Sequence, residues 1–303
     1  MLSILLAICS TILFSVVITA DRLLLARYLS NPKSLVFLIS IVQLLMGLVI
    51  AIVQPWDSTL SLGAMATGLL SGFAWGLSII TLIYGVSRLE VSRVIPLASI
   101  FPVFVALLAA PLLGEGFSSI QYLSILLTVV GAGLLARSGI RVAGGNRRKT
   151  ELNTYLIVLL GSLLTAIAHV TFKFAIPEIE FWDLFILRSL CCAIIWSIWG
   201  LHSNLLQEIR NIYSTKAGLS LFTAVECVIA PIAVLLMVGA LALGPASIAA
   251  TLFATRPLFV LIISGLLSTR YWNILNEPFS RDVLPAKLLF TTMIVTGVAG
   301  VLL

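Results

Sequence analysis

Five ionisable side chains lie inside long apolar runs of this sequence: Glu226, Arg256, Arg188, His169 and Lys173. A charged side chain at the centre of a membrane helix costs roughly 2.5–3.5 kcal/mol, so such a group usually faces a cavity or a partner. These residues are therefore the first candidates for binding a ligand or carrying a proton.

Glu226 and Arg256 lead these candidates. Glu226 lies in the stretch LFTAVECVIAPIAV, where it could carry a coupling proton or cation, or hold a substrate amine. The alternative is a structural ion pair with Arg256 or Arg188. For Arg256 we expect a substrate carboxylate or Glu226 as the partner, in preference to lipid.

His169 and Lys173 are four residues apart, which places them on one face of a helix. We expect His169 to be buried and hydrogen-bonded, with a proton relay as the alternative. Lys173 lies near the end of its apolar run, where it either snorkels to the interface or lines a cavity. Trp75 either packs in the core or lines a cavity for apolar or aromatic ligands.

Motifs of enzyme chemistry are absent from the sequence. It contains no HExxH, GxxxxGK[ST] or GxSxG pattern and no EF-hand loop. Its four cysteines all lie within apolar runs, without the spacing of a disulfide framework or a metal site. We therefore predict no catalytic residue, no metal and no cofactor, and we do not expect an enzyme.

The composition indicates an all-α polytopic membrane protein. Mean hydropathy is +1.17, 60% of the residues are apolar and 10% are charged, against roughly 25% charged residues in soluble domains. The net charge of +6 does not indicate nucleic-acid binding, because the basic residues lie in short loops and form no continuous face.

Ten apolar runs approach the ~20 residues that a bilayer helix needs, so we predict ten transmembrane helices. Five precede a basic segment containing RSGIRVAGGNRRK and five follow it. The predicted spans are Leu2–Ala20, Ser34–Val53, Leu62–Tyr84, Val94–Leu113, Ser118–Leu135, Thr154–Phe174, Trp182–Gly200, Leu219–Leu243, Ser247–Leu267 and Ala286–Leu303.

Two stretches indicate that the chain is a duplication. Ser92–Glu115 carries three prolines, and a weaker copy follows at Ser247–Thr269. Alignment of Pro102 with Pro257 gives an offset of 155 residues, about half of the 303-residue chain. Membrane helices tolerate internal prolines, because neighbouring groups satisfy the freed carbonyls. We therefore predict kinked helices at equivalent places, with Pro102 and Pro257 as hinges.

An odd number of spans in each copy makes the two copies lie in opposite orientations, as a 5+5 inverted repeat. The predicted organisation is a first repeat over residues 1–136, a basic cytoplasmic linker over 137–153 and a second repeat over 154–303. At the offset of about 155, Arg256 falls opposite Phe101, so we expect an electrically asymmetric cavity.

Loop charge predicts the orientation. Fifteen of the 18 Lys and Arg residues lie in, or flank, the loops after odd-numbered spans. The positive-inside rule places these loops in the cytoplasm and both termini outside. We expect a multi-pass protein of the cell membrane, plasma or inner.

Glycines predict close helix packing in the third span. Gly68, Gly72 and Gly76 are four residues apart, so they form one stripe along which another backbone can approach. Gly131 and Gly297 provide similar surfaces in spans five and ten.

The chain resembles the EamA-like, ten-span members of the drug/metabolite transporter superfamily. The resemblance rests on the 5+5 spans, on Pro96-x5-Pro102 followed by PLLGE, on the copy of this stretch in span nine and on the glycine-rich spans five and ten. Span one ends ITADRLLLARY, which is similar to the Asp-Lys-x-Leu-Leu ending of some members, with Arg22 in place of the lysine.

This resemblance implies a central cavity, built by spans one, three, four, six, eight and nine, and alternating access without a cofactor. Carried over to this sequence, the cavity candidates are Trp75, Pro96, Ser99, His169, Lys173, Glu226, Thr255 and Arg256.

We therefore predict a secondary transporter that moves a small organic metabolite, amino-acid-like or amphipathic, in a proton-coupled or facilitative manner. The alternatives are a flippase for lipid-linked headgroups and a non-transporting membrane scaffold or assembly partner. The expected partners are the small-molecule substrate and the lipid bilayer, without nucleic acid. We expect a monomer, with a dimer as the alternative.

Overall fold

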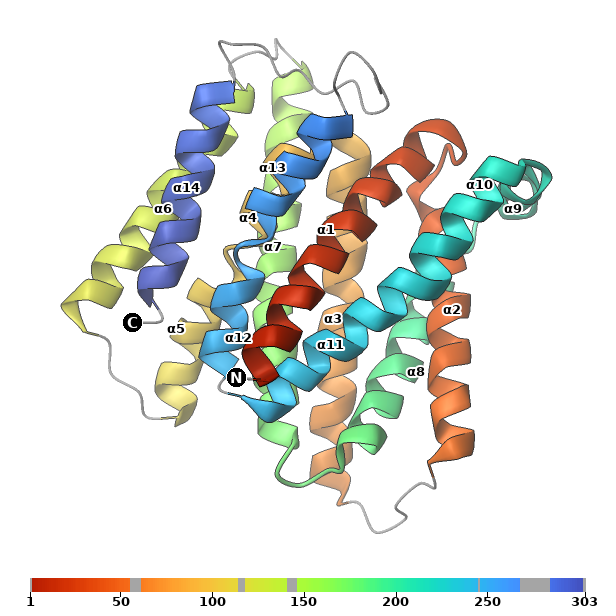
Figure 1. Ribbon diagram of the computed structural model, residues 1–303, viewed down its shortest axis with the longest axis horizontal. Coiled ribbons are helices and arrows are strands. Elements are labelled where there is room, and N and C mark those ends of the chain that lie inside the picture. The colour runs from red at the N-terminus through yellow and green to blue at the C-terminus, as the bar shows by residue number, and fades with distance from the viewer. Residues whose placement is uncertain are drawn as a thin grey trace.

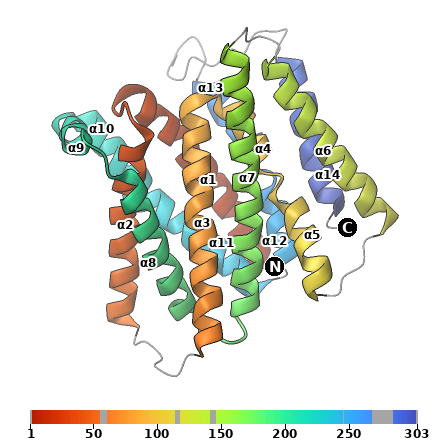
Figure 2. The same ribbon diagram turned by 180° about the vertical axis from the view of Figure 1, so that it is seen from behind.

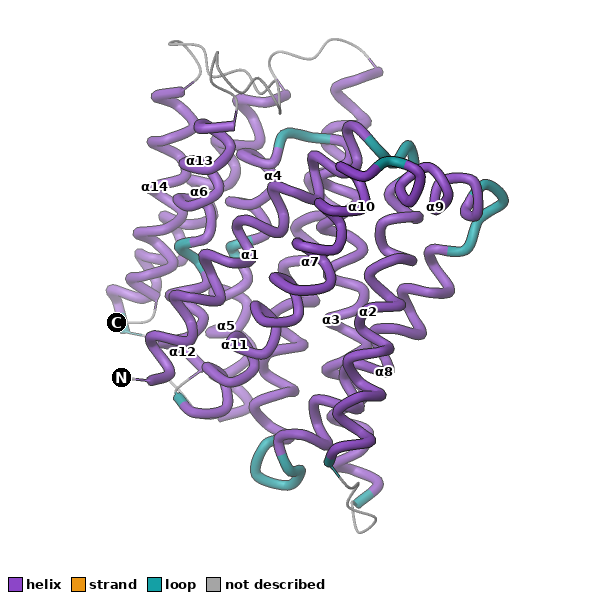
Figure 3. Tube along the Cα trace, turned by 45° about the vertical axis from the view of Figure 1, so that its right-hand side comes forward, coloured by secondary structure: helices purple, strands orange, loops and turns teal. Residues whose placement is uncertain are grey.

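Long apolar helices packed side by side make up the computed structural model of the chain (Figure 1). The structure describes residues 2–54, 61–113, 118–140, 146–244, 246–267 and 284–301. Every regular element among these residues is helical (Figure 3). The predicted all-α class is confirmed. Gly114 and Glu115 of the PLLGE motif and residues 141–145 of the predicted linker lie outside the described residues.

Within the described residues, six helices are long and apolar enough to cross a membrane. They are α1 (Leu2–Arg27), α2 (Pro32–Val53), α3 (Leu62–Arg88), the Glu151–Ala175 part of α7 (Asn146–Ala175), α8 (Phe181–Gly200) and Lys216–Leu243. The last consists of α10 (Lys216–Phe222), the π-helix η1 (Thr223–Ile229) and α11 (Ala230–Leu243). The protein is thus a multi-pass membrane protein, and the count of ten spans stays a prediction.

The predicted fourth and ninth spans are each divided into two helices. The fourth consists of α4 (Val91–Ala98) and α5 (Phe101–Leu113), and the ninth of α12 (Ala246–Phe253) and α13 (Arg256–Leu267). Shorter apolar helices include parts of α6 (Ser119–Ile140) and α14 (Leu284–Val301). The prolines cause the division, because a proline has no N–H and its ring clashes with the carbonyl four residues earlier.

The same hydrogen bonds surround both breaks. At the first, the N–H groups of Ser99, Ile100 and Val103 donate to the carbonyls of Ile95, Leu97 and Ile100. At the second, those of Ala254, Thr255 and Leu258 donate to Ala250, Leu252 and Thr255. Each bond of the second set lies 155 residues after its counterpart. The expected kinks therefore occur at equivalent positions, two residues before Pro102 and Pro257, and are complete breaks of the helix.

Four helix pairs dominate the packing: α3 with α7, α1 with α11, α2 with α8 and α6 with α14. Figure 2 shows α3 beside α7, and α6 beside α14 at one edge of the bundle. The divided helices also meet, since α4 packs on α13 and α5 on α12. The two breaks therefore lie within the bundle, between α1 on one side and α7 on the other.

The predicted glycine stripe of α3 faces α8. A Cβ atom on Gly72 would lie 2.8 Å from the Cβ atom of Cys191 and 3.0 Å from the backbone of Arg188. At this contact the Cys192 thiol donates to the Gly72 carbonyl at 3.2 Å, and the Trp196 indole donates to the Gly76 carbonyl at 2.8 Å. The stripe therefore serves close packing, as predicted. Gly131 and Gly297 likewise lie at the contact of α6 with α14.

A short amphipathic helix, α9 (Leu205–Ser214), precedes α10 and is bonded to the start of α2. Glu208, 7% exposed, accepts hydrogen bonds from the Ser30 and Ser34 hydroxyls, both at 2.5 Å, and from the Asn31 N–H at 3.3 Å. A carboxylate at this place satisfies backbone and side-chain donors at the N-terminus of α2.

Candidate functional site

Two neighbouring cavities lie inside the bundle. The first, which we call the acidic cavity, lies between α1, α2, α3, α8, η1, α11 and α13. Its charged and amide side chains are Asp21, Gln43, Glu226 and Arg256. The rest of its wall is largely apolar and includes the rings of Phe14, Trp75 and Trp196.

The second cavity, which we call the hydroxyl cavity, lies between α3, α7 and the two divided helices. It is lined by hydroxyl groups and His169, together with the aromatic rings of Phe101 and Phe253. Its hydroxyl residues are Ser78, Thr81, Ser99 and Thr165. Trp75 and Arg256 line both cavities, so they form part of the boundary between them.

Glu226 lies in the acidic cavity beside a second carboxyl group, that of Asp21. The two side chains are 2% and 3% exposed and are in hydrogen-bond contact with each other. The Oε1 atom of Glu226 and the Oδ1 atom of Asp21 are buried without a hydrogen-bond partner. Within the described residues, neither group takes part in a salt bridge, so the alternative of an ion pair with Arg256 or Arg188 is not realised.

Asp21 lies just outside the first predicted span, which ends at Ala20. The structure continues α1 to Arg27, which places Asp21 inside the helix. The signal was the run Leu23–Leu25, which continues the apolar pattern beyond the charged pair. The neighbouring Arg22 donates to the carbonyls of Val86 and Ser87, at 2.9 and 3.2 Å. Arg22 therefore serves the end of α3 and does not pair with Asp21.

A π-helical turn presents Glu226 to the cavity. In η1 the Ala230 N–H reaches back five residues to the Val225 carbonyl. Pro231, at the start of α11, has no N–H with which to resume the regular pattern. Single π-helical turns are frequent at functional sites, because the extra residue redirects side chains. Glu226 lies within this turn and lines the acidic cavity.

Arg256 begins α13 at the break of the ninth span. Its guanidinium carbon lies 4.8 Å from the centre of the Phe14 ring, and its Nε atom is buried without a hydrogen-bond partner. The Ser15 hydroxyl contacts its carbonyl at 3.5 Å. Thr255, at the same break, donates its hydroxyl to the Leu252 carbonyl at 2.7 Å. The break therefore places a guanidinium group at the cavity wall, and the Nε–H of this group has no hydrogen-bond acceptor.

His169 lies where both divided helices meet α3 and α7. Its ring centre is 5.6 Å from that of Trp75, 5.2 Å from Phe101 and 6.1 Å from Phe253. Its Nδ1 atom is 2.8 Å from the Thr165 carbonyl, so it is buried and hydrogen-bonded, as expected. The guanidinium carbon of Arg188 lies over the Trp75 ring, 4.5 Å from the ring centre.

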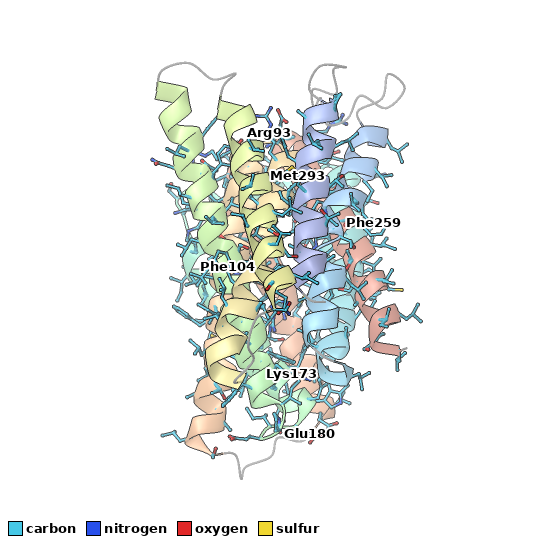
Figure 4. The ribbon with its side chains drawn as sticks, turned by 90° about the vertical axis from the view of Figure 1, so that its left-hand side faces the viewer. Arg93, Phe104, Lys173, Glu180, Phe259 and Met293 are labelled. Carbon is cyan, nitrogen blue, oxygen red and sulfur yellow. The ribbon has the colours of Figure 1, made fainter. Side chains whose placement is uncertain are left out.

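Lys173 is not among the residues that line these two cavities. Its ammonium group donates to the carbonyls of Leu241 and Gly244, at 3.3 and 3.2 Å. Figure 4 shows it toward the end of the bundle that carries Glu180, opposite the end with Arg93. A lysine near the C-terminal end of a helix donates hydrogen bonds to the last carbonyls, and its positive charge interacts favourably with the negative end of the helix dipole.

Five of the eight predicted cavity residues line the two cavities. Glu226, Arg256 and Trp75 meet in the acidic cavity, and Ser99 and His169 join Arg256 and Trp75 in the hydroxyl cavity. Thr255, Pro96 and Lys173 are not among the lining residues, although Thr255 and Pro96 lie in the divided spans. Asp21 and Gln43 are lining residues that the sequence analysis did not select.

Comparison with known proteins identifies the first half of the chain. Residues 1–137 match the model of the EamA-like transporter family. The match covers 137 of the 303 residues, and over these residues the chain is similar to EamA-like transporters. Members of this family are generally not enzymes, and membership suggests a secondary transporter. The family predicted from the prolines and the span pattern is confirmed over residues 1–137.

Two further comparisons complete this result. No curated protein matches the chain. A solved structure, described only as "Crystal structure of protein", superposes on 98% of this chain and 95% of its own, with a TM-score of 0.59 and 12% sequence identity. At that identity the likeness shows the fold alone.

Proposed function

We propose that this EamA-like transporter moves a small organic metabolite, amino-acid-like or amphipathic, through the membrane by alternating access. The observation that carries the proposal is the acidic cavity, where Glu226 and Arg256 lie in a wall that is otherwise largely apolar. Small-molecule sites have this character, with a few polar groups in a largely apolar wall. Charged groups inside a membrane helix bundle also mark substrate or ion pathways.

The packing of the helices supports ten spans arranged as an inverted repeat. In an inverted repeat, α3 of the first half corresponds to α11 of the second half, and α1 corresponds to α7. The contact of α3 with α7 should then have a counterpart in the contact of α11 with α1, and both contacts are present. The pairs of α2 with α8 and α6 with α14 each map onto themselves. The repeated hydrogen bonds at the breaks, 155 residues apart, favour the same relation. In transporters of this design, substrate sites lie where repeats meet and helices are interrupted.

The acidic cavity lies toward one end of the bundle. We propose that this arrangement is the state of the alternating-access cycle in which that end is open. Asp21 and Trp196 are within six residues of the ends of α1 and α8, on the side of the odd-numbered loops. Toward the opposite end α1 packs on α11, where the Ser10 hydroxyl donates to the Ala233 carbonyl at 2.9 Å. We propose that rocking about the breaks at Pro102 and Pro257 exchanges the open and closed ends.

We propose that the carboxyl pair carries the coupling proton. Two negative charges side by side in an apolar wall repel strongly, and one proton between them replaces that repulsion by a hydrogen bond. The charged and titratable groups around Glu226 are Asp21 from α1, Arg256 from α13 and the adjacent Cys227. Loss or gain of this proton would couple substrate movement to a pH gradient.

Uptake by the purified, full-length chain in liposomes tests this function. Vesicles would be loaded with amino acids and amphipathic metabolites, one class at a time, with and without a pH gradient. We expect one class to exchange across the membrane faster than in protein-free vesicles, and its accumulation to fall when an ionophore removes the gradient. Equal fluxes with and without protein, for every class, would reject a transport function and favour a scaffold.

We also propose that the odd-numbered loops face the cytoplasm, on the evidence of loop charge. An epitope inserted into the linker, residues 137–153, should then be inaccessible to antibody in intact cells and accessible after permeabilisation. A tag at the N-terminus is the matched control and should show the reverse. Labelling of the linker tag in intact cells would reverse the assigned orientation.

A further inference from the structure

We propose that Asp21 and Glu226 together form a binding site for an organic ammonium group, whose apolar body lies along the aromatic wall of the acidic cavity. This inference rests on the proposed function, because it names the class of molecule that the cavity takes. It adds Asp21 to the site as a residue that contacts the ammonium group directly.

The first argument is that the chain itself provides no cation for these two carboxyl groups within the described residues. Each has one buried oxygen without a partner, and both groups line the cavity. Arg22, the nearest basic residue in sequence, is bonded to the carbonyls of Val86 and Ser87. Arg256 stacks on Phe14, two helical turns before Asp21, which at 1.5 Å per residue is about 10 Å along α1. A cation that pairs with the two carboxyl groups would therefore enter the cavity as a ligand.

The second argument concerns the kind of cation. Calcium takes six to eight oxygen ligands, and magnesium demands a near-complete octahedron. Beyond the two carboxyl groups, the amide of Gln43 supplies the one other side-chain oxygen among the described residues that line this cavity. Its Nε2 atom donates to the Ser189 hydroxyl at 2.8 Å. The described residues also contain no group of three metal-binding side chains. An ammonium group, with three N–H donors, needs far fewer acceptors.

The third argument comes from the walls and from the second charge. The rings of Phe14, Trp75 and Trp196 line the space around the carboxyl pair. Aromatic faces attract organic cations and bury the apolar part of a ligand. Arg256 repels a cation from the far end of the cavity, so the ammonium group points to Asp21 and Glu226. A ligand of this kind is bound at one end by charge and along its length by apolar contact.

Three probes of one shape test the inference on the purified, full-length wild-type chain. They are phenethylamine, 2-phenylethanol and 3-phenylpropanoate, which carry a positive, a neutral and a negative group on the same ring. By calorimetry at fixed pH we expect phenethylamine to bind about tenfold or more tighter than the other two, as charge-assisted hydrogen bonds do. Equal binding of the alcohol, or tighter binding of the carboxylate, would overturn the inference.

Variants then locate the site. Asp21→Asn and Glu226→Gln should each weaken phenethylamine binding about tenfold or more, whereas Asp21→Glu should keep part of it. Glu178→Gln, the same kind of change at an exposed position, should leave it unchanged. Unchanged binding in Asp21→Asn would overturn the assignment, as would displacement of the amine by equimolar sodium. The wild-type probe series decides the matter if a variant does not fold.

The inference and the proposed function fail in distinguishable ways. If the chain carries a metabolite under the pH gradient while phenethylamine does not bind, the ammonium site is rejected and transport stands. If phenethylamine binds through Asp21 and no metabolite class moves in liposomes, the site stands and the transport function is rejected.

Discussion

Transport by the Glu226→Gln variant is expected to lose its dependence on pH. The amide has nearly the shape of the carboxyl group and can still donate to Asp21, so the helix contacts of η1 should persist. It cannot release a proton between pH 5 and 8, so a proton gradient no longer drives the cycle. We expect gradient-driven accumulation in liposomes to fall by about tenfold or more, because intramembrane carboxyl groups are the groups through which a proton gradient acts in transporters.

The comparison that gives this experiment its meaning is between two modes of transport in one preparation. Relative to the wild type, Glu226→Gln should keep a larger fraction of the rate of substrate exchange without a gradient than of the gradient-driven accumulation. Glu178→Gln, at an exposed position between α7 and α8, should behave as wild type in both modes. A Glu226→Gln protein that keeps the wild-type pH profile would remove Glu226 from the coupling mechanism.

The second large effect is on stability. Gly72→Leu should prevent α3 from packing on α8, because the first added atom already meets Cys191 at 2.8 Å and the Arg188 backbone at 3.0 Å. Backbone atoms cannot move aside without a shift of the whole helix. The Cys192 and Trp196 hydrogen bonds to Gly72 and Gly76 would be lengthened as well. We expect a loss of about 3 kcal/mol in the free energy of unfolding, measured by thermal unfolding in detergent.

Gly63→Leu is the matched control for this change. Gly63 lies on the same helix and is exposed, and a Cβ atom added to it would have no neighbouring atom within 4 Å. The same added volume should therefore leave the unfolding temperature near that of the wild type. A Gly72→Leu protein as stable as Gly63→Leu would show that the α3–α8 contact does not hold the bundle together.

Several features were predictable from local chemistry. A carboxyl group or a guanidinium within an apolar run is conspicuous in any membrane sequence, and Glu226 and Arg256 both lie in the acidic cavity. Pro102 and Pro257 predicted interrupted helices, because a missing N–H disturbs the helix wherever it occurs. Glycines four residues apart predicted the close face of α3. None of these predictions required knowledge of which helices are neighbours.

Asp21 was not predictable in the same way. A charge pair near the end of an apolar run is typical of a membrane boundary, and only the length of α1 shows that Asp21 lies within the helix. Lys173 is the converse case. Its spacing from His169 predicted that both side chains lie on one face of a helix. The lysine, however, donates a hydrogen bond to a carbonyl at the end of α11, whereas aromatic rings from three other helices surround the histidine.

The sequence by itself therefore determined the membrane class, the charged residues inside it, the two interruptions and the glycine face, because each follows from the chemistry of a short stretch. The tertiary structure decided which side chains share a space. Asp21 meets Glu226 because α1 packs on η1 and α11, and Arg256 borders both cavities because the ninth span is divided beside α1. Such contacts join residues far apart in the chain, and their free energy depends on burial that no single stretch contains.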